Sequence, residues 1–370
     1  MEIHKEMFLI RNLLLMLVAI AALFIMKSLA GILLPLVFAL LLSILYLPLI
    51  MFLEKKHFPK GLGIVLIVVM TLGIILVVAN VFISTINEII NQQDYLITQL
   101  HDRFLAIAAL LGEIPYLDID AAVLQDGLNN LLNKNMMTSA VGGLLKGASS
   151  FGSSFLMFTL YFIFLLPGMS RYEHFIRYVG GDQNSYLEDY EKIQQNISTY
   201  MIIKTTISSV TGTIAWLICT MLGLKFAFFW GFLTFILNFI PSIGSIIATL
   251  LPSLMGLILL ETYNEFLLLF LLLGINQLII GNFLDPKIMG NRLRLNTVAV
   301  LFGLVFWGVI WGIPGMLLSV PLSVTLKLIL EKSSSWSVLA RIMGSAEPEE
   351  KETKESFFKK IFKNRKKKDS

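Results

Sequence analysis

Four residues with polar or small side chains recur at helical spacing inside a strongly apolar stretch of the sequence. They are Gly274, Gln277, Gly281 and Asp285. In an α-helix, which turns by about 100° per residue, these positions lie within about 80° of one another. Because amide and carboxylate groups are costly in lipid, we expect this face to contact protein or water rather than hydrocarbon.

Asn238 is a second candidate for binding a polar ligand. It lies three residues before Pro241, and a proline leaves a nearby backbone carbonyl group without its usual helical donor. Such carbonyl groups, the amide oxygens of Asn238 and Gln277 and the carboxylate of Asp285 are hard oxygen ligands that could hold a small cation. The carboxylate could also exchange a proton. Two structural alternatives are open: the amides only link helices, and Asp285 only caps the following loop.

Other kinds of chemistry have little support in the sequence. Cys219 is the single cysteine, so an intrachain disulfide is excluded. The four histidines are scattered and lack the spacing of metal ligands, and no phosphate-binding P-loop is present. We therefore expect no metal site, no cofactor and no enzymatic activity.

The composition indicates the environment in which these residues lie. Apolar residues make up 56% of the chain and charged residues 15%, against about 45–50% and about 25% in soluble domains. The apolar residues form runs long enough to cross a hydrocarbon core, which takes about 20 residues of α-helix. Since lipid offers no hydrogen bonds to the backbone, these runs must be helical. The sequence predicts an all-α integral membrane protein, folded as a multi-pass helical bundle, and excludes a soluble enzyme.

Changes in polarity along the chain define six segments. A cleaved signal peptide at the start is disfavoured, because a second apolar run follows the first at once. In chain order we expect N-terminal transmembrane helices (1–83), an external amphipathic helical segment (84–140), a transmembrane helix (141–169), a cytoplasmic amphipathic segment (170–204), a transmembrane transport core with broken helices (205–330) and a basic cytoplasmic tail (331–370).

The distribution of charge predicts the orientation in the cell membrane. Lysine and arginine gather in 54–60, in 170–204 and in the tail, whereas 84–140 and 261–265 are acidic. Basic loops face the cytoplasm, so one threading places all the basic pieces and the C-terminus inside.

Basic side chains near the ends of spans are assigned to the membrane surfaces. Lys204 and Lys225 flank one span, and we expect their long side chains to extend to the two interfaces. The stretch FFKKIFKNRKKK near the C-terminus is expected to bind anionic lipid. Nucleic-acid binding is the disfavoured alternative.

Two apolar blocks are interrupted by proline and glycine. They are 226–260, with Pro241 and Gly244, and 297–329, with Pro314 and Gly315. As one helix, each block of about 34 residues would rise about 50 Å, well beyond the hydrocarbon core. If each block formed two full spans, each span would have only about 17 residues, and almost none would be left for the turn between them. We therefore predict two re-entrant hairpins of half-helices, entering from opposite sides of the membrane. One or two ordinary spans with a kink are the alternative.

Paired interruptions of this kind are typical of the substrate site of a secondary transporter. Backbone that is not helical is tolerated at membrane depth only where protein or a water-filled cavity surrounds it. The interrupted blocks and the polar face between them therefore predict a shared polar centre.

Three stretches of the C-terminal third resemble the signatures of the autoinducer-2 exporter (AI-2E) family. The order of the predicted spans matches the plan of that family along most of the chain as well. The stretches are NFIPSIG at 238–244, NQLIIGNFLDPKIMGNRLRL at 276–295, in which Pro286, Lys287, Met289 and Gly290 form the family loop, and GIPGMLLSVP at 312–321.

The resemblance implies a multi-pass permease of the bacterial inner membrane. Members of the family are linked to export of the signalling molecule autoinducer-2 or to exchange of sodium or lithium for protons, and one branch is associated with sporulation. A homo-oligomer, with a pentamer as one form, and an elevator-like moving unit are also implied. The sequence departs from the common pattern at Asn296-Thr297, where many members carry His-Pro, and at Asp285.

The expected function is therefore that of a secondary transporter. It would move a small polar metabolite, or exchange sodium for protons, by alternating access. Its expected partners are the lipid bilayer, the transported solute or ions and further copies of the same chain. The alternative is a non-transporting membrane scaffold, for example in sporulation, that works through its external segment and basic tail.

Overall fold

Long helices make up nearly all of the described structure. The computed structural model describes residues 2–112, 134–169, 184–289, 295–332 and 336–344, and within these ranges it has no strand, only an isolated bridge between Leu295 and Gly344. The predicted all-α class is confirmed. The elements are α1 (Glu2–Ser28), α2 (Ala30–Lys55), α3 (Lys60–Asn91), α4 (Gln93–Gly112), α6 (Lys134–Met169), α8 (Asn184–Met221), α9 (Ala227–Leu237), α10 (Ile243–Leu259), α11 (Tyr263–Asn276), the π-helix η1 (Gln277–Leu284), α12 (Asp285–Met289), α13 (Thr297–Glu331) and α14 (Ser337–Met343).

Several helices have the length and apolarity of membrane spans. Large apolar side chains such as Val69, Phe164 and Val309 are exposed on their outer faces, as expected where hydrocarbon rather than water surrounds the protein. The chain is thus a multi-pass membrane protein. Within the described ranges six stretches qualify as spans: Ala30–Lys55, Lys60–Asn91, Gly152–Met169, Glu191–Met221, Tyr263–Met289 and Thr297–Glu331.

Helices run through several of the boundaries that polarity suggests. α3 continues past residue 83 to Asn91, α6 begins before residue 141, and α8 passes through residue 204 without a break. No glycine or proline lies near residues 83 and 204 to end a helix there, and Gly142 and Gly143 do not interrupt α6. A polar stretch can therefore continue a membrane helix into the aqueous phase. Residues 113–133, 170–183 and 345–370, which include parts of the predicted external and cytoplasmic segments and most of the tail, lie outside the described residues.

The first interrupted block folds as a helical hairpin. α9 ends at Leu237, α10 begins at Ile243, and the two helices pack against each other. Ser242 has a left-handed φ of 59°, which reverses the chain. Gly244 lies so close to α9 that a Cβ there would collide with the carbonyl oxygen of Leu237. Glycine is therefore required at residue 244, in the first turn of α10.

The second interrupted block also folds back on itself, as two helices joined by a sharp kink inside α13. Trp307 Nε1 donates to Ser323 Oγ at 3.2 Å, whereas residues sixteen apart in a straight helix would be separated by about 24 Å. Gly308 similarly lies against Met316. The reversal occurs at Gly312, where φ is 65° and ψ is −145°.

The bend of the second block was predicted at Pro314, and the structure corrects this position to Gly312. Proline has a fixed negative φ and cannot supply the positive φ of the reversal. Pro314 instead lies in the first turn of the returning arm, where a missing N–H is tolerated. At Gly315 a Cβ would collide with the carbonyl oxygen of Trp307, so Gly315 allows the two arms to approach.

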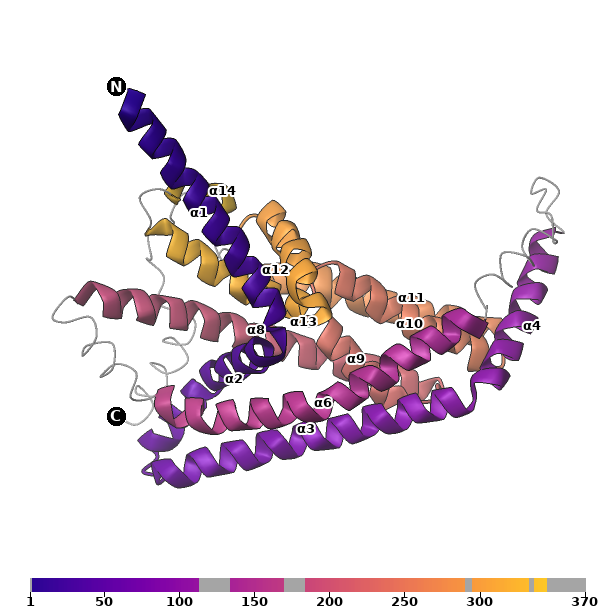
Figure 1. The fold of residues 1–370 in the computed structure, drawn as a ribbon. Helices are drawn as coiled ribbons and strands as arrows, with labels where there is room; N and C mark the ends of the chain where they lie inside the picture. The colour runs from indigo at the N-terminus through magenta and orange to yellow at the C-terminus, as the bar shows by residue number, and fades with distance from the viewer. Residues whose placement is uncertain (1, 113–133, 170–183, 290–294, 333–335, 345–370) are drawn as a thin grey trace.

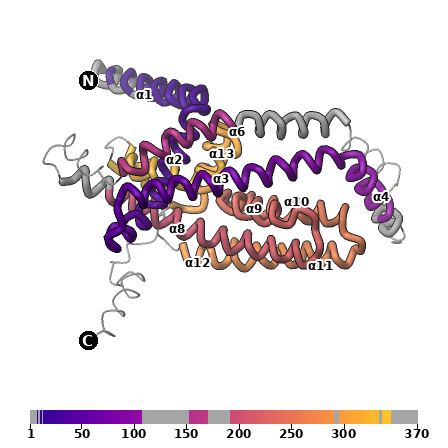
Figure 2. The backbone as a smooth tube through the Cα atoms, turned by 90° about the horizontal axis from the view of Figure 1, so that it is seen from below, coloured from indigo at the N-terminus to yellow at the C-terminus, as the bar shows by residue number. Residues whose placement is uncertain are grey.

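The two hairpins extend from opposite ends of the molecule. The α10–α11 connection lies beside α4 (Figure 1), whereas α13 packs on α1, α2 and α14. Figure 2 shows α9, α10 and α11 running side by side toward α4, with α13 on the other side of the centre. Where the hairpins meet, Leu237 and Ile240 pack in one cluster with Leu304, Met316 and Leu317.

α4 is attached to the first hairpin by one arginine. Arg103 Nη2 donates to the backbone carbonyl oxygens of Leu260 at 2.7 Å and Glu261 at 3.1 Å. Its guanidinium group also lies over the ring of Tyr263, 5.3 Å from the centroid. The loop between α10 and α11 is thereby held against α4.

Gly312→Ala should destabilise the protein, because an alanine at this φ and ψ is strained by about 1–3 kcal/mol. The measurement is thermal unfolding of the detergent-purified protein. Gly73→Ala is the matched control: Gly73 lies inside α3, its added Cβ meets nothing within 4 Å, and the change should be neutral or slightly stabilising. Equal unfolding temperatures for Gly312→Ala and the wild type would contradict the reversal at Gly312.

Candidate solute and ion site

One face of α8 is polar although it lies inside a candidate membrane span. Lys204, Ser208 and Thr211 are all buried, and their spacing of four and three residues places them on one side of the helix. α11, η1 and α12 pack against α8. The polar face of α8 therefore meets the segment that carries Gln277 and Asp285.

The prediction that Lys204 extends to a membrane interface is wrong. Its ammonium group forms an ion pair with Asp285, and the two side chains are only 8% and 14% exposed. A carboxylate at the start of α12 supplies a counter-charge within reach, so the lysine need not seek water. The signal that sequence reasoning missed is the helical spacing of Lys204 with Ser208 and Thr211.

The ion pair leaves neighbouring polar atoms unsatisfied. Oδ1 of Asp285 and the hydroxyl group of Tyr200 are buried and form no hydrogen bond within the described part of the chain. Tyr200 lies one turn before Lys204 on α8, the helix against which α12 packs. Buried polar atoms without partners are rare in proteins, so a proton or a small cation could be accommodated here. Among the described residues, no three His, Cys, Asp or Glu side chains come together as a metal site.

Two amide side chains connect α8 to the first hairpin and to α11. Asn238 Nδ2 donates to Ser208 Oγ at 3.0 Å, and Asn276 Nδ2 donates to the carbonyl oxygen of Thr211 at 3.1 Å. Both amide groups are buried. The alternative considered for Asn238, that its amide links helices, is thus observed. Asn276 links helices as well, and it was not among the residues predicted from sequence.

Gln277 differs from these two amides. It is 5% exposed, and neither its Nε2 nor its Oε1 atom has a partner among the described residues. A Cβ on Gly281 would lie 3.0 Å from Gln277 Oε1, 3.4 Å from Ser245 Oγ and 3.8 Å from Asn238 Oδ1. The structure therefore brings Asn238, Gln277 and Gly281 together, with Ser245 as an additional hydroxyl group, whereas Asp285 is paired with Lys204.

The helix that carries Gln277 is wider than expected. From Gln277 to Leu284 it is a π-helix, in which the N–H of Asp285 bonds to the carbonyl oxygen of Ile280, five residues earlier. The α-helical angles used to group Gln277, Gly281 and Asp285 therefore do not apply here. π-Helical turns are frequent at functional sites, and the sequence carries no simple signal for them.

A cavity of about 430 Å³ lies between α10 and the α11–η1 segment. Its volume is in the range of small-molecule sites, about 300–1,000 Å³. The described lining combines apolar side chains with hydroxyl and amide groups and contains no charged residue. The polar or small lining residues are Ser245, Thr249, Gly274, Gln277 and Asn282.

The arrangement of the chain agrees with comparisons to known proteins. A family model described as AI-2E family transporter matches residues 13–335. The chain belongs to the AI-2E family. The AI-2 transport protein TqsA of Escherichia coli K12 is 30% identical over 321 residues, 86% of this chain and 91% of that protein. The putative transport protein YhhT of the same strain is 26% identical over 319 residues, 86% of this chain and 90% of that protein.

A third relative is similar over a comparable share of both chains. A putative transport protein of Haemophilus influenzae is 28% identical over 329 residues, 87% of this chain and 92% of that protein. The predicted family and the general role of a membrane permease are thereby confirmed.

The loop by which the AI-2E family was recognised begins as a short helix. Pro286, Lys287 and Met289 lie in α12, whereas Gly290 lies outside the described residues. Lys287 lies over the ring of Phe283, 5.5 Å from the centroid. Met289 is buried in a hydrophobic cluster that also contains residues of α8 and α13, and α12 packs against α8.

Asn296 has a structural role in this chain. Its Oδ1 accepts from the backbone N–H of Ala299 at 2.7 Å and caps α13. Its Nδ2 donates to the carbonyl oxygens of Ile342 at 2.6 Å and Gly344 at 3.2 Å. The residue therefore fastens the start of α13 to α14.

Asp285→Asn should destabilise the protein by about 3–5 kcal/mol, because it leaves the buried Lys204 ammonium group unpaired. The double variant Lys204→Met/Asp285→Leu removes both charges and should recover most of the loss. Thermal unfolding in detergent measures both. Lys225→Met is the control: the Lys225–Glu88 pair is about half exposed, so its loss should cost at most about 1 kcal/mol. A double variant no more stable than Asp285→Asn would contradict a buried ion pair.

Proposed function

We propose that this protein is a secondary transporter of the cell membrane that moves a small polar solute by alternating access. The observation that carries the proposal is Gln277, a buried amide with no partner in the described chain, at the wall of the 430 Å³ cavity. The cavity adjoins the turn of a broken helix, which is where secondary transporters bind their substrates.

The lining of the cavity supports a neutral, hydroxyl-bearing solute. A buried amide without partners costs free energy, and a solute hydroxyl group can both donate to Oε1 and accept from Nε2 of Gln277. Ser245 and Thr249 add hydroxyl groups on α10. Because one relative is named as an AI-2 transport protein, autoinducer-2 is a suitable first probe.

Exchange of sodium for protons is the second candidate, and a separate observation favours it. Asp285 keeps one buried carboxylate oxygen without a partner among the described residues, while its other oxygen is paired with Lys204. A carboxylate of this kind can bind a cation or a proton in turn. Asp285 is therefore proposed as the coupling group, and Lys204 as the charge that compensates it when no cation is bound.

The two hairpins are proposed to be re-entrant and to enter from opposite leaflets. α9–α10 would enter from the outer side, where Glu261 and Glu265 lie, and α13 from the cytoplasmic side, where Lys287 and the C-terminal tail lie. Their contact at Leu237 and Leu304 would then be near the middle of the membrane. Segments 84–140 and 170–204 remain proposed as external and cytoplasmic, and a homo-oligomer, with a pentamer as one form, as the assembly.

Gln277→Met keeps the length of the side chain and removes its amide group, so it should reduce solute flux at least about tenfold, the effect of one lost buried hydrogen bond. Flux of autoinducer-2, sodium and protons into proteoliposomes is the measurement. Gln93→Met, in the first turn of α4, is the matched control and should transport normally. Unchanged flux in Gln277→Met would refute the site. No flux of any probe through the wild type, with normal assembly, would favour the membrane scaffold.

Opposed hairpins predict opposite accessibility at the two turns. Ser242→Cys and Ile313→Cys, each in a Cys219→Ala background, place a thiol in an exposed position of each turn. A membrane-impermeant maleimide should label the first more readily from outside and the second from inside. Labelling of both from one side would refute the proposed topology.

A further inference from the structure

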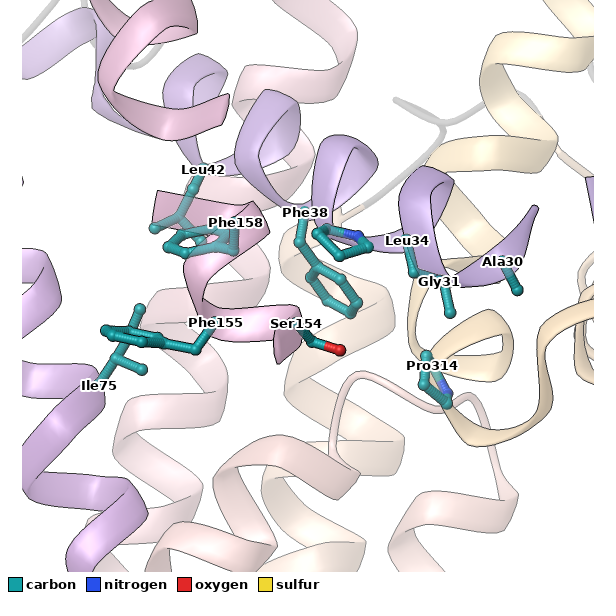
Figure 3. A pocket seen from close by; sticks show the side chains of 11 residues that line it. Ala30, Gly31, Leu34, Phe38, Leu42, Ile75, Ser154, Phe155, Phe158 and Pro314 are labelled. Atoms are coloured by element: carbon teal, nitrogen blue, oxygen red, sulfur yellow. The ribbon is translucent and has the colours of Figure 1, made fainter. Parts of the chain in front are cut away.

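A second cavity lies apart from the polar site. It has a volume of about 440 Å³ and is bounded by α2, α3, α6 and the turn of the α13 hairpin (Figure 3). Pro314 closes one side, next to Gly31, and Phe155 and Phe158 of α6 close another. The remaining lining residues are Ala30, Leu34, Pro35, Phe38, Leu42, Ile75 and Ser154.

The walls of this cavity cannot hold water. A buried water molecule needs two to four polar partners, and the Ser154 hydroxyl group is the single polar side-chain group among the described lining residues. Empty space is also unfavourable, because the lining atoms then lose their dispersion contacts. An apolar occupant is therefore favoured over both water and empty space.

The surroundings of the cavity indicate which apolar occupant is at hand. α2, α3, α6 and α13 all contain candidate membrane spans. Ile32, Ile74 and Leu156, each next to a lining residue on its helix, are exposed. The cavity is thus continuous with surfaces that face hydrocarbon, and the lipid acyl chains of the bilayer are the molecules with access to it.

We propose that this cavity binds one acyl chain of a membrane phospholipid. The chain would lie between the α2–α6 wall and Pro314, and would support the turn of the α13 hairpin. Its volume is in the range of a specific small-molecule site, about 300–1,000 Å³. The proposal concerns a lipid site, and it does not depend on which solute or ion the protein transports.

Glycine residues provide a matched pair of variants. A Cβ added at Gly31 meets nothing within 4 Å, so Gly31→Leu would place its side chain in the cavity without displacing backbone. A Cβ at Gly73 on α3 likewise meets nothing within 4 Å, but Gly73 does not line the cavity. Gly73→Leu therefore adds the same volume to the outer surface. Ser154→Leu fills the cavity from α6 and serves if Gly31→Leu does not fold.

The experiment uses the full chain reconstituted into vesicles of palmitoyl-oleoyl phosphatidylcholine, extracted in a mild maltoside detergent and examined by native mass spectrometry. The wild type and Gly73→Leu should each retain a single phospholipid per chain. Gly31→Leu and Ser154→Leu should lose it, while their thermal unfolding in detergent shows a folded protein.

Three results would overturn the proposal. The first is a wild type that retains no phospholipid. The second is retention by folded Gly31→Leu and Ser154→Leu at the wild-type level. The third is a change of oligomeric state, without loss of lipid, in the cavity-filling variants, which would show that a second copy of the chain fills the cavity.

Discussion

The structure depends on how the backbone reverses direction inside an apolar protein. Hydrocarbon supplies no hydrogen bonds, so each turn must satisfy its own N–H and C=O groups. In the first hairpin it does so with short-range bonds: the N–H groups of Ile240 and Gly244 reach the carbonyl oxygens of Leu237 and Ile240. In the second, the whole reversal is concentrated at Gly312. Both reversals use few residues, and the two hairpins pack together through Leu237, Ile240 and Leu304.

The polar residues are organised by α8, which is continuous where the neighbouring elements are broken. It presents Lys204 to α12, Ser208 to the first turn and the Thr211 backbone to α11. Each of these contacts joins α8 to a different element, so the helix fixes their relative positions. Gln277 is left out of this network, which leaves an amide available for a ligand in a region that is otherwise held rigidly.

Local features of the sequence predicted the class of the fold and both reversals. Apolar run lengths gave the spans, and the glycine and proline pairs gave the hairpins. They also singled out Asn238, from its place before Pro241, and Gln277, from the polar face between the two blocks, and the structure brings these two residues together. The ion pair between Lys204 and Asp285 was out of reach, since it joins residues 81 positions apart through the packing of α8. The π-helix has no simple signal in the sequence. The residue at which the second block reverses could not be chosen from sequence, because Gly312, Pro314 and Gly315 lie so close together.

The contact of Arg103 with the α10–α11 loop affects which residues of that loop evolution must keep. Arg103 recognises the carbonyl oxygens of Leu260 and Glu261, which every amino acid carries, and makes no demand on their side chains. Selection for this contact would therefore act on Arg103 and on the aromatic ring of Tyr263, and not on the side chains of Leu260 and Glu261.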